Sequence, residues 1–214
     1  MNHVRHIGIF TCAGWEISLI GAGGIGSPTA LALAKMGISR IEVFDDDRVD
    51  EVNVAVQMYG TEDIGLYKSI ALDSLVRRYA EPVIVPFIYR VDRTDRFTTP
   101  IVISAVDSLE ARKEIWEAVK QSSCYWYLDA RMGAENFQLF SVNMQDTAWY
   151  DFIVTNFSDD DVPTEPCSSK ATIFTAFMAA GHIGRAVRMI VTGAHKAGVL
   201  THDIRNEELE GWAS

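Results

Sequence analysis

The chain has 214 residues, 48% of them hydrophobic, and a formal net charge of −10 with an isoelectric point near 4.9. This length and hydrophobic content suffice for one α/β domain with its own core, which excludes a disordered chain. The acidic balance argues against a nucleic-acid or anionic-membrane partner, because both bind a positive protein surface.

Apolar runs alternate with helical patterns along the first part of the chain, as is typical of β-α-β units. We expect strands at 16–20, 40–44, 83–89 and 101–106, with helices at 28–36, 67–79 and 109–121. Two more strands, at 126–130 and 137–142, precede a long polar stretch at 144–170 and a final helix at 171–192. The pattern predicts an α/β fold with a Rossmann-like, doubly wound, mostly parallel sheet and additional antiparallel strands.

Residues 1–214 are interpreted as one domain with an N-terminal arm (1–15), a crossover loop (144–170) and a polar, peripheral tail (193–214). A loop as long as 144–170 within a compact domain is either functional or mobile. The start of the chain lacks the apolar stretch of a signal peptide, and no later stretch is long enough to span a membrane. The three cysteines have no CxxC spacing. We therefore expect a cytoplasmic protein with reduced thiols and no structural zinc.

A glycine-rich turn between the first strand and the first helix has the pattern GxGxxG, with glycines at Gly21, Gly23, Gly24 and Gly26. Glycines let the backbone turn sharply and approach a phosphate, and the following helix N-terminus offers free N–H groups. Asp45 ends the second strand, where an acid can bind ribose hydroxyls. These features predict a nucleotide site, and on their own they favour NAD over ATP.

Four motifs occur together in one order: GAGGIGS, VFDDDRVDEVNVAVQ, GLYK and SAVDSLEAR. With them the stretch 17–191 resembles the ThiF/MoeB/HesA-type adenylyltransferase family, whose fold is shared with ubiquitin-activating enzymes. The resemblance implies a single ThiF-type adenylation domain that uses ATP and Mg²⁺ to activate the C-terminal carboxylate of a ubiquitin-like or sulfur-carrier protein. It also implies a homodimer, with a conjugating enzyme or a sulfur donor as a further partner.

The resemblance also implies residue roles around the nucleotide. Asp45 would hold the ribose, and Gly24 would lie against the phosphates. Asn53 and Gln57, in the loop after Asp47, would face the triphosphate together with that aspartate.

Lys68 would contact phosphate oxygens, Asp107 would bind Mg²⁺, and Arg112 stands where the family often has an arginine. Adenylation brings a carboxylate anion to the α-phosphate, so a lysine and a divalent cation must screen the repulsion. An NAD(P)-dependent oxidoreductase, the main alternative, needs neither Lys68 nor Asp107. Each residue also has a structural interpretation: Lys68 opens an ordinary helix, Asp107 caps the next one, and Asn53 is a turn residue.

The chain departs from the family pattern at Val56, where relatives commonly carry an arginine donated to a neighbouring subunit's phosphates. Whether Arg5 in the short arm replaces another such arginine stays open. A non-catalytic nucleotide-binding module of the same fold is therefore a second alternative. An enzyme of the same fold acting on another carboxylate, such as a short peptide or a tRNA-linked amino acid, is a third.

Cys167 precedes the final helix, and Lys170 lies between Cys167 and that helix. A helix N-terminus and a nearby cation both lower a thiol pKa, and the position is similar to the family's crossover-loop cysteine, so Cys167 is a candidate to take the acyl group as a thioester. The alternative is a residue that adenylation does not require. Cys12 and Cys124 are interpreted as packing residues, and His182 as a core or interface histidine. Arg131 follows an expected strand and is a candidate to help place the substrate tail.

Overall fold

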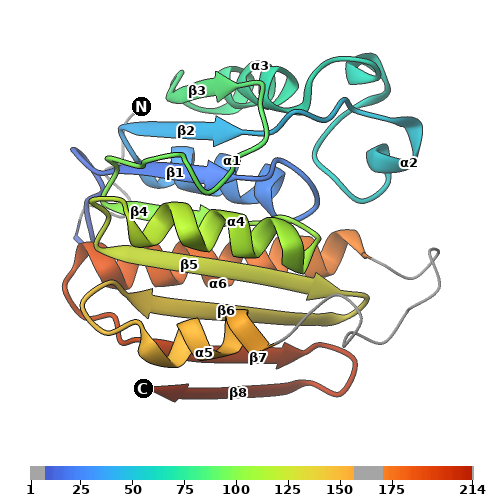
Figure 1. The fold of residues 1–214 in the computed structure, drawn as a ribbon. Coiled ribbons are helices and arrows are strands. Elements are labelled where there is room, and N and C mark those ends of the chain that lie inside the picture. The colour runs from blue at the N-terminus through green and yellow to red at the C-terminus, as the bar shows by residue number, and fades with distance from the viewer. Residues whose placement is uncertain (1–7, 157–170, 214) are drawn as a thin grey trace.

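The parallel half of the sheet is built from short apolar strands in the order β3-β2-β1-β4-β5 (Figure 1). The computed structural model describes residues 8–156 and 171–213. The five strands are β1 (Glu16–Ile20), β2 (Arg40–Phe44), β3 (Ile84–Phe87), β4 (Ile101–Ser104) and β5 (Trp126–Gly133). Chain order reverses between β1 and β4, which makes this pair the topological switch point of the sheet. Ligands of open α/β sheets bind outside the carboxyl ends of the strands at such a point.

Three antiparallel strands continue the sheet beyond β5, as β6 (Asn136–Asn143), β7 (Gly198–Asp203) and β8 (Glu208–Ala213). The predicted additional antiparallel strands are thus confirmed. The tail at 193–214 is more than a peripheral extension, because β7 and β8 are two strands of the main sheet. Val199 of β7 pairs with Phe140 of β6 and is buried, so the polar composition of the tail concealed a half-buried strand.

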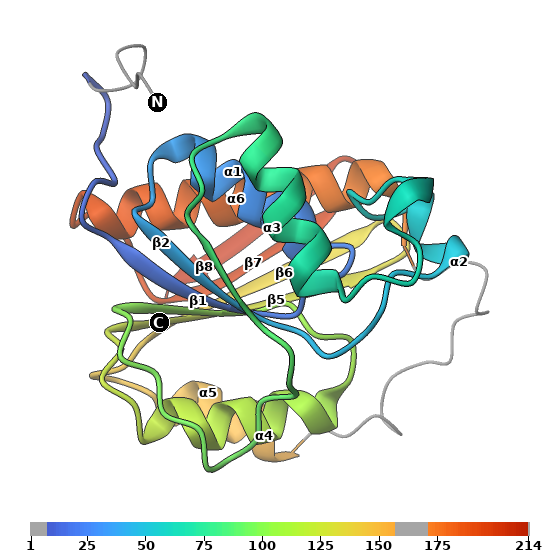
Figure 2. The ribbon, with the colours of Figure 1, turned by 90° about the horizontal axis from the view of Figure 1, so that it is seen from above.

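Helices cover both faces of the sheet (Figure 2). One layer contains α1 (Gly26–Met36), α3 (Lys68–Tyr79) and α6 (Ile173–Val191), and the other contains α4 (Leu109–Lys120) and α5 (Ala148–Asn156). Side chains of a strand point alternately to the two faces. In β5, Leu128 and Ala130 therefore belong to the core under α1 and α6, whereas Tyr127 belongs to the core under α4. The doubly wound fold is confirmed.

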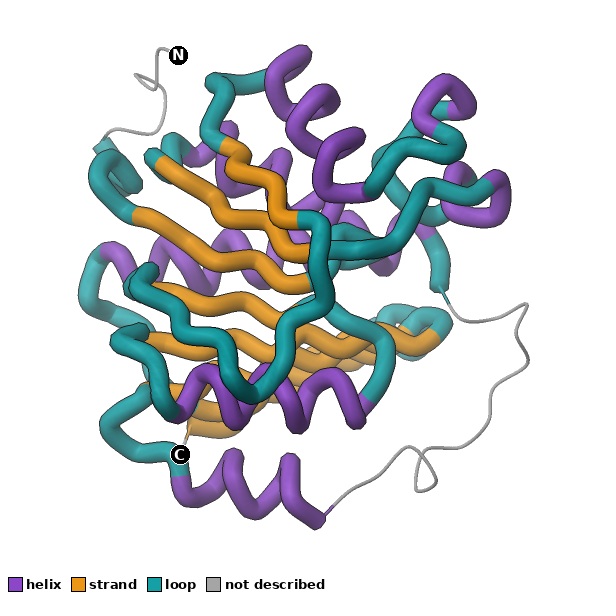
Figure 3. The backbone as a smooth tube through the Cα atoms, turned by 45° about the horizontal axis from the view of Figure 1, so that its top comes forward, coloured by secondary structure: helices purple, strands orange, loops and turns teal. Residues whose placement is uncertain are grey.

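The segment between β2 and α3 contains a short helix, α2 (Glu51–Val54), and one 3₁₀ turn, η1 (Thr61–Asp63), beyond the carboxyl end of β2 (Figure 3). Figure 1 shows this segment at the edge toward which the parallel strands point. The loop that the sequence associates with a triphosphate therefore lies at the carboxyl edge of the sheet.

The expected loop at 144–170 is wrong in its first part, because Ala148–Asn156 form α5. Its aromatic and β-branched residues have low helix propensity, so composition did not reveal the helix. Tertiary contacts stabilise it instead. Tyr150 and Val154, four residues apart, are buried, and Asp151 accepts hydrogen bonds from Trp116 Nε1 and Lys120 Nζ of α4.

Among the described residues, no helix combines the length and apolarity that crossing a bilayer requires.

His195 lies in the connection between α6 and β7, with its ring edge-on to Trp126 at a centroid distance of 4.9 Å. Burial, helped by the positive charge of Arg185, lowers the pKa of His195 to about 4. A histidine in the unfolded chain titrates near 6.5, so the unfolded state binds the proton more tightly. The corresponding stability is complete above pH 6.5 and is lost as the pH falls toward 4.

We predict that protonation of His195 alone lowers the free energy of unfolding by about 1–2 kcal/mol when the pH falls from 7 to 5, after allowance for partial solvation of the ring. In His195→Phe, an aromatic ring that does not titrate, this part of the pH dependence should be absent. Urea denaturation at both pH values measures it. Lys196→Gln, at the neighbouring exposed position, is the control and should retain the wild-type pH dependence. An unchanged dependence in His195→Phe would contradict the prediction.

Candidate functional site

The glycine-rich turn after β1 is in direct backbone contact with the end of β4. Gly21 has a φ of +94°, and a Cβ atom there would lie 2.7 Å from the carbonyl oxygen of Ala105. A Cβ at Gly26 would lie only 1.9 Å from the carbonyl oxygen of Gly21. The first and last glycines of the motif are therefore required by packing, independently of any ligand.

The two middle glycines are different, because Gly23 and Gly24 are partly exposed. A Cβ at Gly23 would have Gln57 Nε2, at 3.8 Å, as its nearest neighbour. At the start of α1 the N-cap residue Ile25 supplies no side-chain cap. A Cβ at Gly24 would lie 3.1 Å from Met132 Cε, so Gly23 has the more open backbone of the two. An open backbone beside helical N–H groups without a side-chain cap is the arrangement that binds phosphate in other α/β proteins.

Asp45, directly after β2, connects that strand to the glycine turn. Its Oδ2 accepts a hydrogen bond of 2.7 Å from the backbone N–H of Ala22, and its Oδ1 accepts one of 2.9 Å from Asp47 N–H. Burial raises the pKa of Asp45, while the Ala22 hydrogen bond and the charge of Lys68 act in the opposite direction. The carboxylate therefore lies beside the turn, where the sequence predicts it.

Lys68 is the first residue of α3, and only 8% of its surface is exposed. Its Nζ lies 2.7 Å from Asp47 Oδ2 in an ion pair. Tyr59, which sequence reasoning missed, has its hydroxyl 2.6 Å from the carbonyl oxygen of Ala22 and 3.2 Å from that of Lys68. Lys68 thus opens a helix, and its ammonium group is held at the same edge as the glycine turn, while its role toward phosphate oxygens stays a prediction.

Asp107 follows β4 with two residues between, and its side chain is exposed. Among the described residues it has no hydrogen-bond or ion-pair partner. The interpretation of Asp107 as a helix cap is wrong, because Ser108 is the N-cap of α4 and its Oγ accepts a hydrogen bond from Ala111 N–H. Asp107 therefore presents an uncommitted carboxylate at the carboxyl end of the switch-point strand.

The loop containing α2 approaches the glycine turn from the other side. Asn53 Oδ1 accepts a hydrogen bond from Asp50 N–H, which confirms a turn role for this side chain. Gln57 Oε1 is buried and has no hydrogen-bond partner in the part of the chain that the structure describes. The carbonyl oxygen of Val56 lies 3.6 Å from the position of a Cβ at Gly24. Gln57 and Val56 are therefore next to the turn, whereas the roles of Asn53 and Gln57 toward a triphosphate stay predictions.

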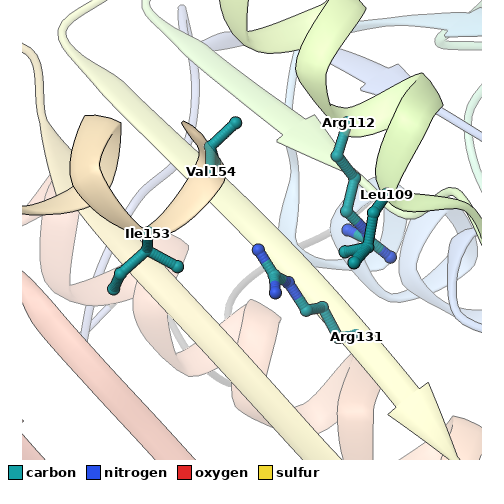
Figure 4. A pocket seen from close by; sticks show the side chains of 5 residues that line it. All are labelled: Leu109, Arg112, Arg131, Ile153 and Val154. Atoms are coloured by element: carbon teal, nitrogen blue, oxygen red, sulfur yellow. The ribbon is translucent and has the colours of Figure 1, made fainter. Parts of the chain in front are cut away.

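A second group of charged residues lies between β5, α4 and α5. Arg112 of α4 and Arg131 of β5, both shown in Figure 4, lie close together. Both form ion pairs with Asp129, whose side chain is completely buried. Burial opposes ionisation of Asp129, but attraction to Arg112 and Arg131 outweighs it and lowers the pKa of this carboxyl group. Sequence reasoning missed Asp129, although a charged residue within the apolar run of β5 was the signal. The role of Arg131 toward a substrate tail stays a prediction.

The remaining candidates lie away from this edge or outside the described residues. Cys167 and Arg5 fall in the segments that the structure does not describe. Cys12 and Cys124 are buried free thiols whose pKa is raised to about 11 by burial, as expected of packing residues. His182 is confirmed as a packed histidine, with Nε2 2.9 Å from His202 Nδ1. Within residues 8–156 and 171–213, no three His, Cys, Asp or Glu side chains form a group that could hold a metal ion by themselves.

Comparison with known proteins gives one matching family model, that of the ThiF family, over residues 13–210. The chain is 30% identical over 133 residues to the probable adenylyltransferase/sulfurtransferase MoeZ of Mycobacterium tuberculosis, which covers 52% of this chain and 34% of MoeZ. It is 31% identical over 124 residues to the sulfur carrier protein adenylyltransferase of Thermus thermophilus, covering 50% of this chain and 46% of that protein. The chain thus spans between a third and a half of these relatives.

Among solved structures, that of PaaA superposes with a TM-score of 0.73 at 19% identity. The match covers 94% of this chain and 64% of PaaA. At this identity the likeness establishes a shared fold.

We predict that Gly26→Ala decreases the free energy of unfolding by about 2 kcal/mol or more, because the new methyl group overlaps the carbonyl oxygen of Gly21. Gly181→Ala in α6 is the matched control, since a Cβ there meets nothing within 4 Å. The control should stabilise the protein by about 0.5–1 kcal/mol. Urea denaturation of both variants tests the prediction, and a Gly26→Ala protein as stable as wild type would contradict it.

Proposed function

Because the chain belongs to the ThiF family, we propose that it uses ATP and Mg²⁺ to adenylate the C-terminal carboxylate of a ubiquitin-like or sulfur-carrier protein. The observation that carries the proposal is the convergence of four elements at one edge. The glycine turn follows β1, Asp45 follows β2, Lys68 opens α3 and Asp107 lies shortly after β4. This is the edge that contains the switch point, where α/β sheets bind ligands. The adenylyltransferase names of the curated relatives support it.

The proposed phosphate site is the partly exposed backbone of Gly23 and Gly24 with the start of α1, which has no side-chain cap. Asp45 keeps lone pairs for ribose hydroxyls, because a carboxylate accepts about four hydrogen bonds and two of its positions are used here. Lys68, held by Asp47, supplies positive charge beside the phosphates.

The residues present fit a magnesium ion. Mg²⁺ binds through one or two carboxylates together with substrate phosphate oxygens, and Asp107 offers an exposed carboxylate without another partner among the described residues. When bound there, the ion supplies charge neutralisation of the phosphates. Lys68 and Arg112 are already paired with Asp47 and Asp129, which is a further reason for a metal ion.

In the proposed reaction a carboxylate oxygen of the substrate attacks the α-phosphorus of ATP. A bond from carboxylate oxygen to phosphorus forms, the bond to the bridging oxygen breaks, and pyrophosphate leaves with its electron pair. No general base is needed, because the nucleophile is already an anion. The protein therefore contributes positioning and electrostatic stabilisation.

The finer parts of the proposal are a homodimer acting in the cytoplasm, with a conjugating enzyme or a sulfur donor downstream. They rest on family resemblance and on cysteine usage. If the chain were an NAD(P)-dependent oxidoreductase, its reaction would need neither Lys68 nor Asp107. The competing non-catalytic module is favoured by one feature only, Val56 in place of an arginine.

We predict that Asp107→Asn lowers carrier-dependent ATP–pyrophosphate exchange by roughly 100-fold, because the amide neither carries charge nor binds Mg²⁺ well. Thermal stability should not change, since Asp107 is exposed and Ser108 caps the helix. Glu110→Gln, an exposed acid three residues later, is the matched control and should retain exchange.

The same assay separates the alternatives. ATP binding without exchange, across candidate carrier proteins, would indicate the binding module. Fluorescence enhancement of NADH on binding would favour the oxidoreductase. Equal exchange by Asp107→Asn and Glu110→Gln would contradict the role of Asp107.

We propose in addition that the Cys167 thiolate attacks the carbonyl carbon of the acyl-adenylate, so that a thioester forms, the bond to the phosphate oxygen breaks and AMP leaves. Intact-mass analysis after incubation with ATP, Mg²⁺ and a carrier protein should show an adduct that dithiothreitol removes and that Cys167→Ala does not form. Cys12→Ala and Cys124→Ala should both retain it, because these buried thiols with a raised pKa are poor nucleophiles. An adduct that persists in Cys167→Ala would exclude this role and leave adenylation untouched.

A further inference from the structure

The buried carboxylate of Asp129 lies on the α4 side of β5, directly beside the end of β4. Its backbone partner across the parallel ladder is Ser104, the last residue of β4. The side chain is fully buried, which is costly for a charged group unless cations and hydrogen bonds satisfy it. Cations and hydrogen-bond donors must therefore surround the Asp129 carboxylate.

Arg112, 4% exposed, links that carboxylate to the loop of Asp107. One terminal nitrogen, Nη1, forms the ion pair with Asp129 Oδ1, and the other, Nη2, donates to the carbonyl oxygen of Val106. Val106 immediately precedes Asp107. The planar guanidinium group thus binds two partners at once, and one of them is the backbone from which Asp107 projects.

The opposite side of Asp129 is occupied by two other groups. Arg131 Nε donates to Oδ2 at 2.8 Å, and Tyr150 of α5 donates its hydroxyl hydrogen to the same oxygen at 2.8 Å. Figure 4 shows Arg112 and Arg131 reaching into one small hollow between α4, α5 and β5. Both oxygens of Asp129 therefore have partners, and the carboxylate is fixed in one orientation.

We infer that Arg112, oriented by Asp129, is a positioning residue that fixes the turn presenting Asp107 to the metal-bound triphosphate. This inference rests on the proposed function. A buried ion pair by itself is weak evidence for stability, because apolar residues of similar volume often serve as well. What an apolar residue cannot supply is the hydrogen bond to the Val106 carbonyl, so the pair is better explained by the geometry of the turn.

Two arginines on one carboxylate provide a matched comparison. Arg112→Met removes the donor to Val106 and leaves Asp129 with Arg131 as its counterion. Arg131→Met removes the other guanidinium and leaves Asp129 with Arg112, so the contact to Val106 stays. Both variants lose one positive charge from the same buried site.

The first measurement needs neither nucleotide nor turnover. Hydrogen–deuterium exchange followed by mass spectrometry should show faster exchange at residues 105–108 in Arg112→Met than in wild type. The same amides in Arg131→Met should exchange at the wild-type rate. Equal acceleration in the two variants, or none in Arg112→Met, would overturn the inference.

The second measurement is the Mg²⁺ dependence of ATP–pyrophosphate exchange. Groups that orient a metal ligand typically contribute about 10–100-fold to metal affinity. Arg112→Met should therefore raise the Mg²⁺ concentration for half-maximal exchange by about tenfold, while Arg131→Met stays within about twofold of wild type. A purely structural role would lower the maximal rate of both variants and leave the Mg²⁺ requirement unchanged, which would count against the inference.

Should Arg112→Met not fold, Arg112→Lys replaces it in both measurements. A lysine keeps a cation beside Asp129, but its single ammonium group lacks the fork that binds both partners. Faster exchange at 105–108 in Arg112→Lys supports the inference, and wild-type exchange there overturns it. Wild-type protein without any ATP–pyrophosphate exchange would refute the proposed function alone, because the amide measurement still decides whether Arg112 holds the turn.

Discussion

The candidate site depends on one steric constraint, the contact between the glycine turn and the end of β4. Gly21 and Gly26 leave no space for a Cβ atom, since the carbonyl oxygens of Ala105 and Gly21 occupy those positions. This contact brings the end of β1 against the end of β4 at the switch point of the sheet. Because Asp45 binds the amide of Ala22 in the same turn, the end of β2 is held there as well. Three strand ends therefore converge before any ligand is considered.

The lysine and the two arginines described above are each paired with a carboxylate. Lys68 is paired with Asp47, and Arg112 and Arg131 share Asp129. Asp107 is left without a cation among the described residues. A triphosphate bound here would meet mostly backbone N–H groups and one lysine, so an external divalent cation is the natural complement to Asp107. The net charge of −10 does not conflict with nucleotide binding, because the backbone N–H groups and the lysine at the site determine whether a nucleotide binds there.

Much of the parallel half of the fold could be predicted from sequence, because its signals are local. The strands at 16–20 and 40–44 agree with β1 and β2, since short apolar runs end at a GxGxxG turn and at an acid. The helix α5 could not be predicted, because Trp116 and Lys120 of α4 stabilise it from a distance in sequence. The strand β7 was not predicted for a similar reason, since only its pairing with β6 buries Val199 in an otherwise polar sequence, and β8 pairs in turn with β7.

The site shows the same division between local and long-range information. The glycine turn and Asp45 come directly after two adjacent strands, and Asp45 Oδ2 accepts a hydrogen bond from Ala22 N–H of the turn, so a motif with its spacing suffices to find them. Asp129 is different, because its importance arises only when the parallel pairing of β4 and β5 sets it beside Ser104 and the first turn of α4 brings Arg112 to it. The two layers of helices thus contribute separately. In the proposed function, the layer of α1 and α3 supplies Lys68 and the backbone that binds phosphate, and the layer of α4 and α5 positions the turn of Asp107 from the opposite face.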